Sequence, residues 1–198
     1  NLITTTKNYI ENKYKKDGYF NTKVFIKTEA DTTDGNNVRM LVNIDKGDKL
    51  KISKITFEGN EQLTDKGLRK AMKNTKQINP IRIFKASKFV KDKYKEDLTS
   101  IVEKYKEKGY RDARVISDSV YLNDKKSKLA INIKVEEGKK YRFGNIKFLG
   151  NSVYSDQLLG RILGIKKGET YNGVLLEKRI ADKSKPDGED ITNLYQNN

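Results

Sequence analysis

The chain has 198 residues, and only 35% of them are hydrophobic, which favours several small modules over one domain with a large core. Lys and Arg number 42 against 27 Asp and Glu, so the formal charge of +15 indicates anionic partners or simply a solvated lysine-rich surface. The absence of Cys and His excludes disulfides, thiol nucleophiles, Cys/His metal sites and histidine acid–base catalysis.

The chain repeats itself with a period of 91 residues. Three landmarks recur at this spacing: Gly18-Tyr19 as Gly109-Tyr110, Lys46-Gly47 as Glu137-Gly138, and Phe57-Glu58-Gly59-Asn60 as Phe148-Leu149-Gly150-Asn151. An unbroken register across all three predicts one folded unit per period. We therefore expect residues 1–49 to be the C-terminal part of one repeat, 50–140 a complete repeat, and 141–198 the N-terminal part of the next.

The first part begins with a predicted helix. Its apolar stripe runs through Ile3, Ile10 and Tyr14, and Gly18 follows as a cap. Two strands should follow, at about residues 21–29 and 38–44, joined by the polar loop 31–36. Apolar residues at every second position of the second run, Val38, Met40, Val42 and Ile44, predict a strand with one buried face.

The residue pattern of the complete repeat predicts five elements in the order strand, helix, helix, strand, strand. The first strand covers 50–57 and ends at a Gly59-Asn60 turn, and Thr64 caps a helix over about 64–72. A second apolar stripe over residues 94–105 predicts another helix, which Gly109 ends. The last two strands, at about 112–121 and 129–135, form a hairpin with a polar loop at 123–127.

The last part repeats the beginning of this pattern. A strand is expected at 141–148, a Ser155-capped helix at about 155–163, and a second helix that begins near Ile191. The hairpin that these helices would cover is not included, so the segment after about Lys183 should be poorly packed or completed by another chain.

The element order predicts an α+β fold made of tandem βααββ modules. Each module should be a three-stranded mixed sheet covered on one face by two helices. A sheet this small has an exposed edge, which is either an aggregation liability or a binding site.

Six glycines have structural explanations in this scheme. Gly18 and Gly109 are predicted to cap helices, and Gly59 and Gly150 to form the turns after the first strand. Gly47 and Gly138 are predicted to lie where the last strand ends.

Residues 66–95 contain 11 Lys or Arg and one acid, which predicts a basic surface. Its candidate members are Arg69, Lys70, Lys73, Lys76, Arg82, Lys85 and Lys88. The pattern is most typical of a solvated face, and the alternative is that anionic headgroups or an acidic protein bind there.

Together, the βααββ order, the I-x-F-x-G-N motif of the first strand, the Gly-Tyr after the second helix and the tandem spacing resemble the POTRA family, the polypeptide-transport-associated modules. NPIRIFKASKF at 79–89, YKEKGYRDA at 105–113, YNG at 171–173 and EKRI at 177–180 are similar to BamA-like outer-membrane assembly factors of a Bacteroidetes type. The resemblance covers essentially the whole chain.

This resemblance implies a non-enzymatic scaffold at the periplasmic face of the outer membrane of a Gram-negative bacterium. Expected partners are unfolded outer-membrane protein precursors, accessory assembly lipoproteins and a C-terminal membrane barrel of the same protein, with anionic headgroups at the membrane surface as a further candidate. No cofactor, metal or nucleic-acid partner is expected. A secretion transporter with the same modules is the main alternative, and an RNA-binding array, suggested by the +15 charge and 11 Tyr, is a remote one.

In POTRA modules the second strand, which is the first strand of the hairpin, is the open edge, and the resemblance places it at about 112–121 and 21–29. The candidate partner-binding residues, called the edge residues below, are Arg111, Asp112, Arg114, Val115, Ile116, Lys23, Phe25 and Lys27. An added strand binds through backbone hydrogen bonds, which tolerate many sequences. The alternative is that these charges only protect the edge from aggregation. No P-loop, dinucleotide-binding or nucleophile motif is present, so enzymatic activity is not expected.

Overall fold

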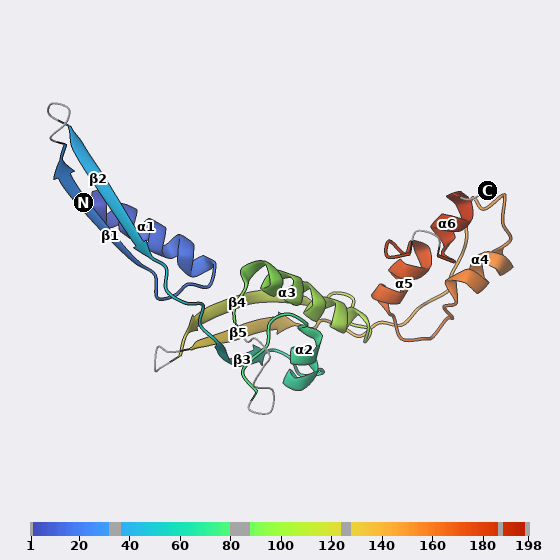
Figure 1. The fold of residues 1–198 in the computed structure, drawn as a ribbon. Helices are drawn as coiled ribbons and strands as arrows, with labels where there is room; N and C mark the ends of the chain where they lie inside the picture. Colours follow the sequence, from blue (N-terminus) through green and yellow to red (C-terminus); the bar gives the residue numbers. More distant parts are fainter. Residues whose placement is uncertain (1, 32–36, 80–87, 124–127, 186–187, 197–198) are drawn as a thin grey trace. The chain divides into compact units, whose positions relative to one another are not determined.

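The computed structural model describes residues 2–31, 37–79, 88–123, 128–185 and 188–196. Its elements, in chain order, are α1 (Leu2–Lys16), β1 (Lys23–Ala30), β2 (Val38–Asp45), β3 (Ile52–Glu58), α2 (Asp65–Ala71), α3 (Lys91–Lys106), β4 (Arg114–Leu122), β5 (Leu129–Glu136), α4 (Asp156–Leu163), α5 (Gly173–Ile180) and α6 (Ile191–Gln196) (Figure 1). The described helices include none that is long and apolar enough to cross a membrane.

The chain forms two compact units. The first contains Asn1–Thr56, Met72–Asp97 and Asp118–Asn132, and the second contains Phe57–Ala71, Leu98–Ser117 and Ile133–Asn198. The boundary runs through β3, α3, β4 and β5, each of which contributes residues to both units. The division into three modules at residues 49 and 140 stays a prediction.

At the N-terminal end, α1 lies along an antiparallel hairpin of β1 and β2 (Figure 1). Val24 of β1 is buried, and its N–H donates to the Glu11 carboxylate of α1 over 3.2 Å. β2 pairs with β1 in a register that sets Val24 opposite Ile44, and every residue of β2 is exposed. The helix therefore covers β1 and leaves the apolar residues of β2 open.

The central sheet has the strand order β3-β5-β4. β3 and β5 run parallel, because Leu129 donates to the Lys51 carbonyl over 2.9 Å at one end while Gly59 lies against the Val135 carbonyl at the other. β4 and β5 form a hairpin, closed by a 2.8 Å bond from the Asn123 N–H to the Lys128 carbonyl. The sheet is therefore mixed, and the predicted α+β fold with the order β-α-α-β-β is confirmed.

The core follows the predicted periodicities. In β5, Leu129, Ile131, Ile133 and Val135 are buried and alternate with more exposed residues. Leu68 of α2 and Ile101 and Tyr105 of α3 are also buried, at the positions that the helical stripes predicted. Burying each large apolar side chain stabilises the fold by about 1.5–3 kcal/mol.

Two buried carboxylates tie the connections to these elements. Asp97 of α3 is fully buried and accepts the backbone N–H groups of Asn74 and Thr75. Glu137, directly after β5, accepts the N–H groups of Gln62 and Leu63. Each carboxylate accepts hydrogen bonds from backbone N–H groups in a connecting loop, the loop after α2 for Asp97 and the loop after β3 for Glu137. These bonds fix the two loops although they have no regular secondary structure.

The 91-residue period is also present in the contacts. Tyr14 and Tyr19 meet edge to face with ring centres 6.1 Å apart, and Tyr105 and Tyr110 do so at 6.0 Å. The same aromatic pair therefore joins the end of the second helix to the following Gly-Tyr in both repeats.

The predicted strand at 141–148 was wrong. Within these residues only Arg142 forms a β-bridge, to Thr170. The equivalent strand β3 is held by β5, whereas nothing lies within 4 Å of the Cβ position of Gly150, the counterpart of Gly59. The described part of the chain contains no equivalent of β5, and the backbone bonds of Tyr141 and Phe143 go instead to the short segment 168–171.

The C-terminal region is more ordered than expected. α4 forms as predicted, with Ser155 accepting the Leu158 N–H, and the unpredicted helix α5 starts at an Asn172 cap. After Lys183, α6 contacts both α4 and α5, and Tyr195 meets Tyr154 edge to face at 5.0 Å. The helices pack on one another, although α6 buries none of its residues.

Candidate functional site

β4 is an edge strand of the central sheet. It pairs with β5 on one side, and no other described strand pairs with it. Its nine residues extend over about 27 Å, and most of its side chains are exposed, including Ile116 and Tyr121. Such an edge presents a row of backbone N–H and C=O groups to an incoming chain.

The start of this edge is oriented by a cross-strand ion pair. The Arg114 guanidinium donates to one carboxylate oxygen of Glu136 on β5, at 2.7 Å from Nη2 and 3.0 Å from Nε. Both side chains are exposed, so the pair adds at most about 1 kcal/mol of stability. Val115 is half-buried, which leaves Ile116 as the exposed apolar side chain of this segment.

Two of the edge residues have a different role from the one expected. Arg111 and Asp112 precede β4, which begins at Arg114, and the structure brings them together with Tyr141. The Tyr141 hydroxyl donates to Asp112 over 2.7 Å, the Arg111 Nε donates to the same carboxylate over 2.9 Å, and the guanidinium lies 4.6 Å from the Tyr141 ring centre. These three residues are called the Tyr141 cluster below.

The Tyr141 cluster joins the turn before β4 to the segment that follows β5. The Tyr141 N–H also donates to the Gly109 carbonyl over 2.9 Å. The hydrogen bond from Tyr141, followed by that from Arg111, lowers the pKa of Asp112, and the same carboxylate raises the pKa of the Tyr141 hydroxyl. Sequence reasoning missed Tyr141, because its role depends on a contact with a residue 29 positions away.

The edge residues of the first repeat lie on β1. Because the sheet of β1 and β2 has only two strands, β1 also has an open edge within the described chain. Phe25 is 58% exposed, and Lys27 forms a 2.7 Å ion pair with Glu29 on the same strand. Lys23 is exposed at the start of β1.

The basic surface is described only in part. Arg82 and Lys85 lie outside the described residues. Arg69 is paired with Asp65 over 3.0 Å, and the Lys76 ammonium donates to the Met72 carbonyl. The exposed members are Lys70, Lys73 and Lys88. Binding of an anionic surface here stays a prediction.

All six glycines singled out in the sequence adopt positive φ angles, between 61° and 102°. Gly59 shows the strongest constraint, because a Cβ atom there would lie 2.2 Å from the Val135 carbonyl oxygen. No partner contact is needed to explain these residues.

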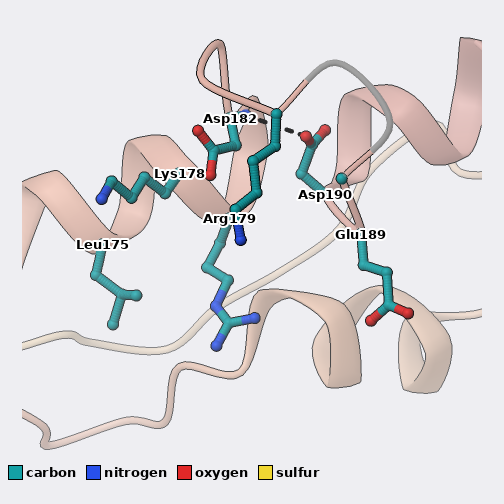
Figure 2. Close-up of a pocket in the computed structure, with 8 residues that line it drawn as sticks. Leu175, Lys178, Arg179, Asp182, Glu189 and Asp190 are labelled. Atoms are coloured by element: carbon teal, nitrogen blue, oxygen red, sulfur yellow. Dashed lines mark hydrogen bonds between the residues drawn. The ribbon is translucent and has the colours of Figure 1, made fainter.

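A cavity of about 520 Å³ lies between α5 and the turn before α6, and it was not foreseen (Figure 2). Its lining mixes cations and acids, and two of the three acids, Asp182 and Asp190, serve the local fold. Asp190 is buried and accepts the Asp182 N–H over 3.0 Å, and Asp182 in turn accepts from Ser184 (Figure 2). Arg179 lies against Gly164 at the end of α4. Asp182 and Asp190 are therefore both engaged in hydrogen bonds of the local turn.

A family model matches almost the whole of the complete repeat, 50–140, and of the last part, 141–198. The POTRA model, described as "Surface antigen variable number repeat", matches residues 50–138 and 141–197. Both matches begin at the first residues of the complete repeat and of the last part as counted from the 91-residue period, and they end within two residues of the ends of these parts.

Curated relatives are outer-membrane assembly factors. The chain is 30% identical over 138 residues to the outer membrane protein assembly factor BamA of Neisseria meningitidis, covering 69% of this chain and 17% of that protein. It is 29% identical to a putative outer membrane protein assembly factor of Treponema pallidum, over 83% of this chain and 19% of the relative. BamA of Buchnera aphidicola is 27% identical over 89% of this chain and 27% of its own length. The chain thus spans less than a third of each relative.

Among solved structures, the crystal structure of Haemophilus influenzae BamA POTRA3-5 is similar, with a TM-score of 0.49 and 19% identity. The match covers 88% of this chain and 65% of that one.

Proposed function

Because this chain belongs to the POTRA family, we propose that it is a non-enzymatic docking segment of an outer-membrane protein assembly factor. It binds unfolded β-barrel precursors, and accessory subunits, at the periplasmic face of the outer membrane. The observation that carries the proposal is the open edge of β4, which offers a strand-length row of backbone groups.

The chemistry of this edge suits partners of many sequences. An added strand gains its affinity from main-chain hydrogen bonds, and precursors of membrane barrels contain segments of about 10 residues with alternating polarity. Such a segment can place apolar side chains against Ile116 and Tyr121, which are 46% and 49% exposed. The polar residues Ser117, Asp118 and Ser119 between them keep the edge soluble when it is empty.

A site-specific photocrosslinking experiment tests this proposal. A crosslinking amino acid at Ile116 on β4 should capture an unfolded barrel precursor or a peptide with one of its strands. The matched control is Lys134, which is exposed on β5, the central strand of the same sheet. Equal capture at both positions, or capture only at the control, would contradict strand addition at β4.

Hydrogen exchange separates strand addition from simple side-chain contact. Bound peptide should slow exchange of alternate β4 amides, because only every second N–H points away from β5. Slower exchange without that alternation would indicate contact without an added strand.

A secretion transporter built from the same modules is the second candidate. Breadth of binding distinguishes the two, since an assembly factor should bind strands from several unrelated barrels and a transporter a single exported protein. RNA binding is disfavoured by the burial of Tyr94, Tyr105 and Tyr110, whose rings cannot stack on bases.

A further inference from the structure

β3 forms the second edge of the central sheet, and this edge is covered by another part of the chain. The strand order β3-β5-β4 leaves one side of β3 without a strand partner among the described residues. The connection that follows α2 lies along this side, and its residues 74–79 are called the strap below. The central sheet therefore has one open edge, on β4, and one covered edge, on β3.

The strap bonds to backbone groups that an added strand would use. The Ile78 N–H donates to the Ile52 carbonyl over 2.8 Å. The Ile55 N–H donates to the side-chain oxygen of Gln77 over 3.1 Å. An acceptor and a donor of the β3 edge are thus both satisfied from within the chain.

A buried carboxylate anchors the start of the strap. Asp97 of α3 is fully buried and accepts the backbone N–H groups of Asn74 and Thr75. Thr75 is also buried, whereas Gln77 and Ile78 are half-buried. The strap is therefore held by α3 at its start and lies against β3 through Gln77 and Ile78.

The same arrangement recurs in the next repeat. There the Gly168 N–H donates to the carbonyl of Phe143, the counterpart of Ile52 at the 91-residue spacing, over 2.8 Å. In each repeat an isolated antiparallel β-bridge lies one residue before this carbonyl. The bridged pairs are Lys51 with Lys88 and Arg142 with Thr170. The connections between the two helices differ in length, 72–90 in one repeat and 164–172 in the other, and still make these contacts. Coverage of this edge is therefore a feature of the repeat and not of one loop.

We propose that the strap limits strand binding in the complete repeat to β4. It occupies the outer edge of β3 as an incoming strand would, so the sheet accepts one partner strand and not two. A sheet that accepted strands at both edges would join precursors into a growing stack. The inference rests on the proposed binding at β4 and adds the residues that exclude binding at the other edge, Gln77 and Ile78.

Photocrosslinking at both edges measures this restriction. The probe is a synthetic peptide of about ten residues with alternating apolar and polar side chains, as in a barrel strand. A crosslinking amino acid at Ile116 reports binding at β4, and one at Lys54, which is exposed on β3, reports binding at β3. In the otherwise unaltered chain, Ile116 should capture the peptide and Lys54 should not.

A double variant, Gln77→Ala with Ile78→Pro, releases the strap. It removes the acceptor of the Ile55 N–H and one donor to β3, so exchange of the Ile55 amide should become at least about tenfold faster. Lys54 should then capture the peptide about as well as Ile116 does. Gln77→Glu with Ile78→Val is the matched control, because it keeps the acceptor and the N–H, and Lys54 should again capture nothing. Capture at Ile116 in both variants checks that the sheet remains folded.

The outcomes separate the inference from the proposed function. Three results would each overturn the role of the strap: capture at Lys54 in the unaltered chain, an unchanged Ile55 exchange rate in the double variant, or faster Ile55 exchange without capture at Lys54. Absence of capture at Ile116 in every variant would instead overturn binding at β4. Capture at Lys54 in the double variant alone would support the strap even then.

Discussion

Replacing Gly59 with alanine should strongly destabilise the central sheet. Gly59 has a φ of 79°, and a Cβ atom there would lie 2.2 Å from the backbone carbonyl oxygen of Val135. The left-handed conformation costs a side chain about 1–2 kcal/mol. The clash is with backbone of β5, which cannot rotate away as a side chain could, and overpacking adds about 1–3 kcal/mol. The expected loss is therefore about 2–5 kcal/mol.

Gly138→Ala is the matched control in the same repeat. Its φ is 68°, and its added Cβ would lie 3.4 Å from the Asp112 Cβ, an ordinary contact. This variant should show the conformational cost of about 1–2 kcal/mol alone. Gly150→Ala is a second control, because it occupies the same turn one repeat later with nothing within 4 Å.

Hydrogen exchange of the β5 amides is the appropriate measurement, because a chain with several units need not unfold in one step. Gly59→Ala should speed exchange of the β5 amides more than Gly138→Ala does. The difference should be about tenfold for each 1.4 kcal/mol by which its destabilisation exceeds that of Gly138→Ala. Equal rates in the two variants would refute the steric reasoning and show that β5 yields to the added methyl group.

Three other perturbations have defined outcomes. Asp97→Ala leaves the backbone N–H groups of Asn74 and Thr75, the latter buried, without their acceptor, and it should cost about 2–4 kcal/mol, measured by exchange of the α3 amides. Tyr141→Phe removes the largest cause of the lowered Asp112 pKa, so an NMR titration should show that pKa rising; an unchanged value would refute the contact. In the wild type, the stabilisation from ionised Asp112 should be present above its unfolded pKa and lost as pH falls through the lowered folded pKa, seen as faster exchange around Tyr141 in acid. Gly67→Ala should stabilise α2 by about 0.5–1 kcal/mol, seen as slower exchange of the α2 amides, because the added Cβ lies 3.4 Å from the Thr64 hydroxyl oxygen without a clash. The counterpart of Gly67 one repeat later, Leu158, already carries a side chain.

Local patterns in the sequence determined most of the repeat. The stripe that contains Ile101 and Tyr105 predicted α3, and the alternation from Leu129 to Val135 predicted β5 as a strand with one buried face. These predictions succeeded because helical and strand periodicities report burial directly. The 91-residue spacing then related elements that local patterns alone could not connect.

Strand pairing and long-range contacts depended on the tertiary structure. Residues 143–149 have the pattern of β3 and yet form no strand, because the described part of this repeat contains no equivalent of β5 and the backbone bonds of Phe143 go to the segment 168–171. The sequence predicted that Asp112 lies on the edge strand, but a hydrogen bond from the Tyr141 hydroxyl holds it in the turn before β4. Sequence determines which side chains a segment can bury, whereas partners distant in the chain decide which backbone and polar groups are satisfied.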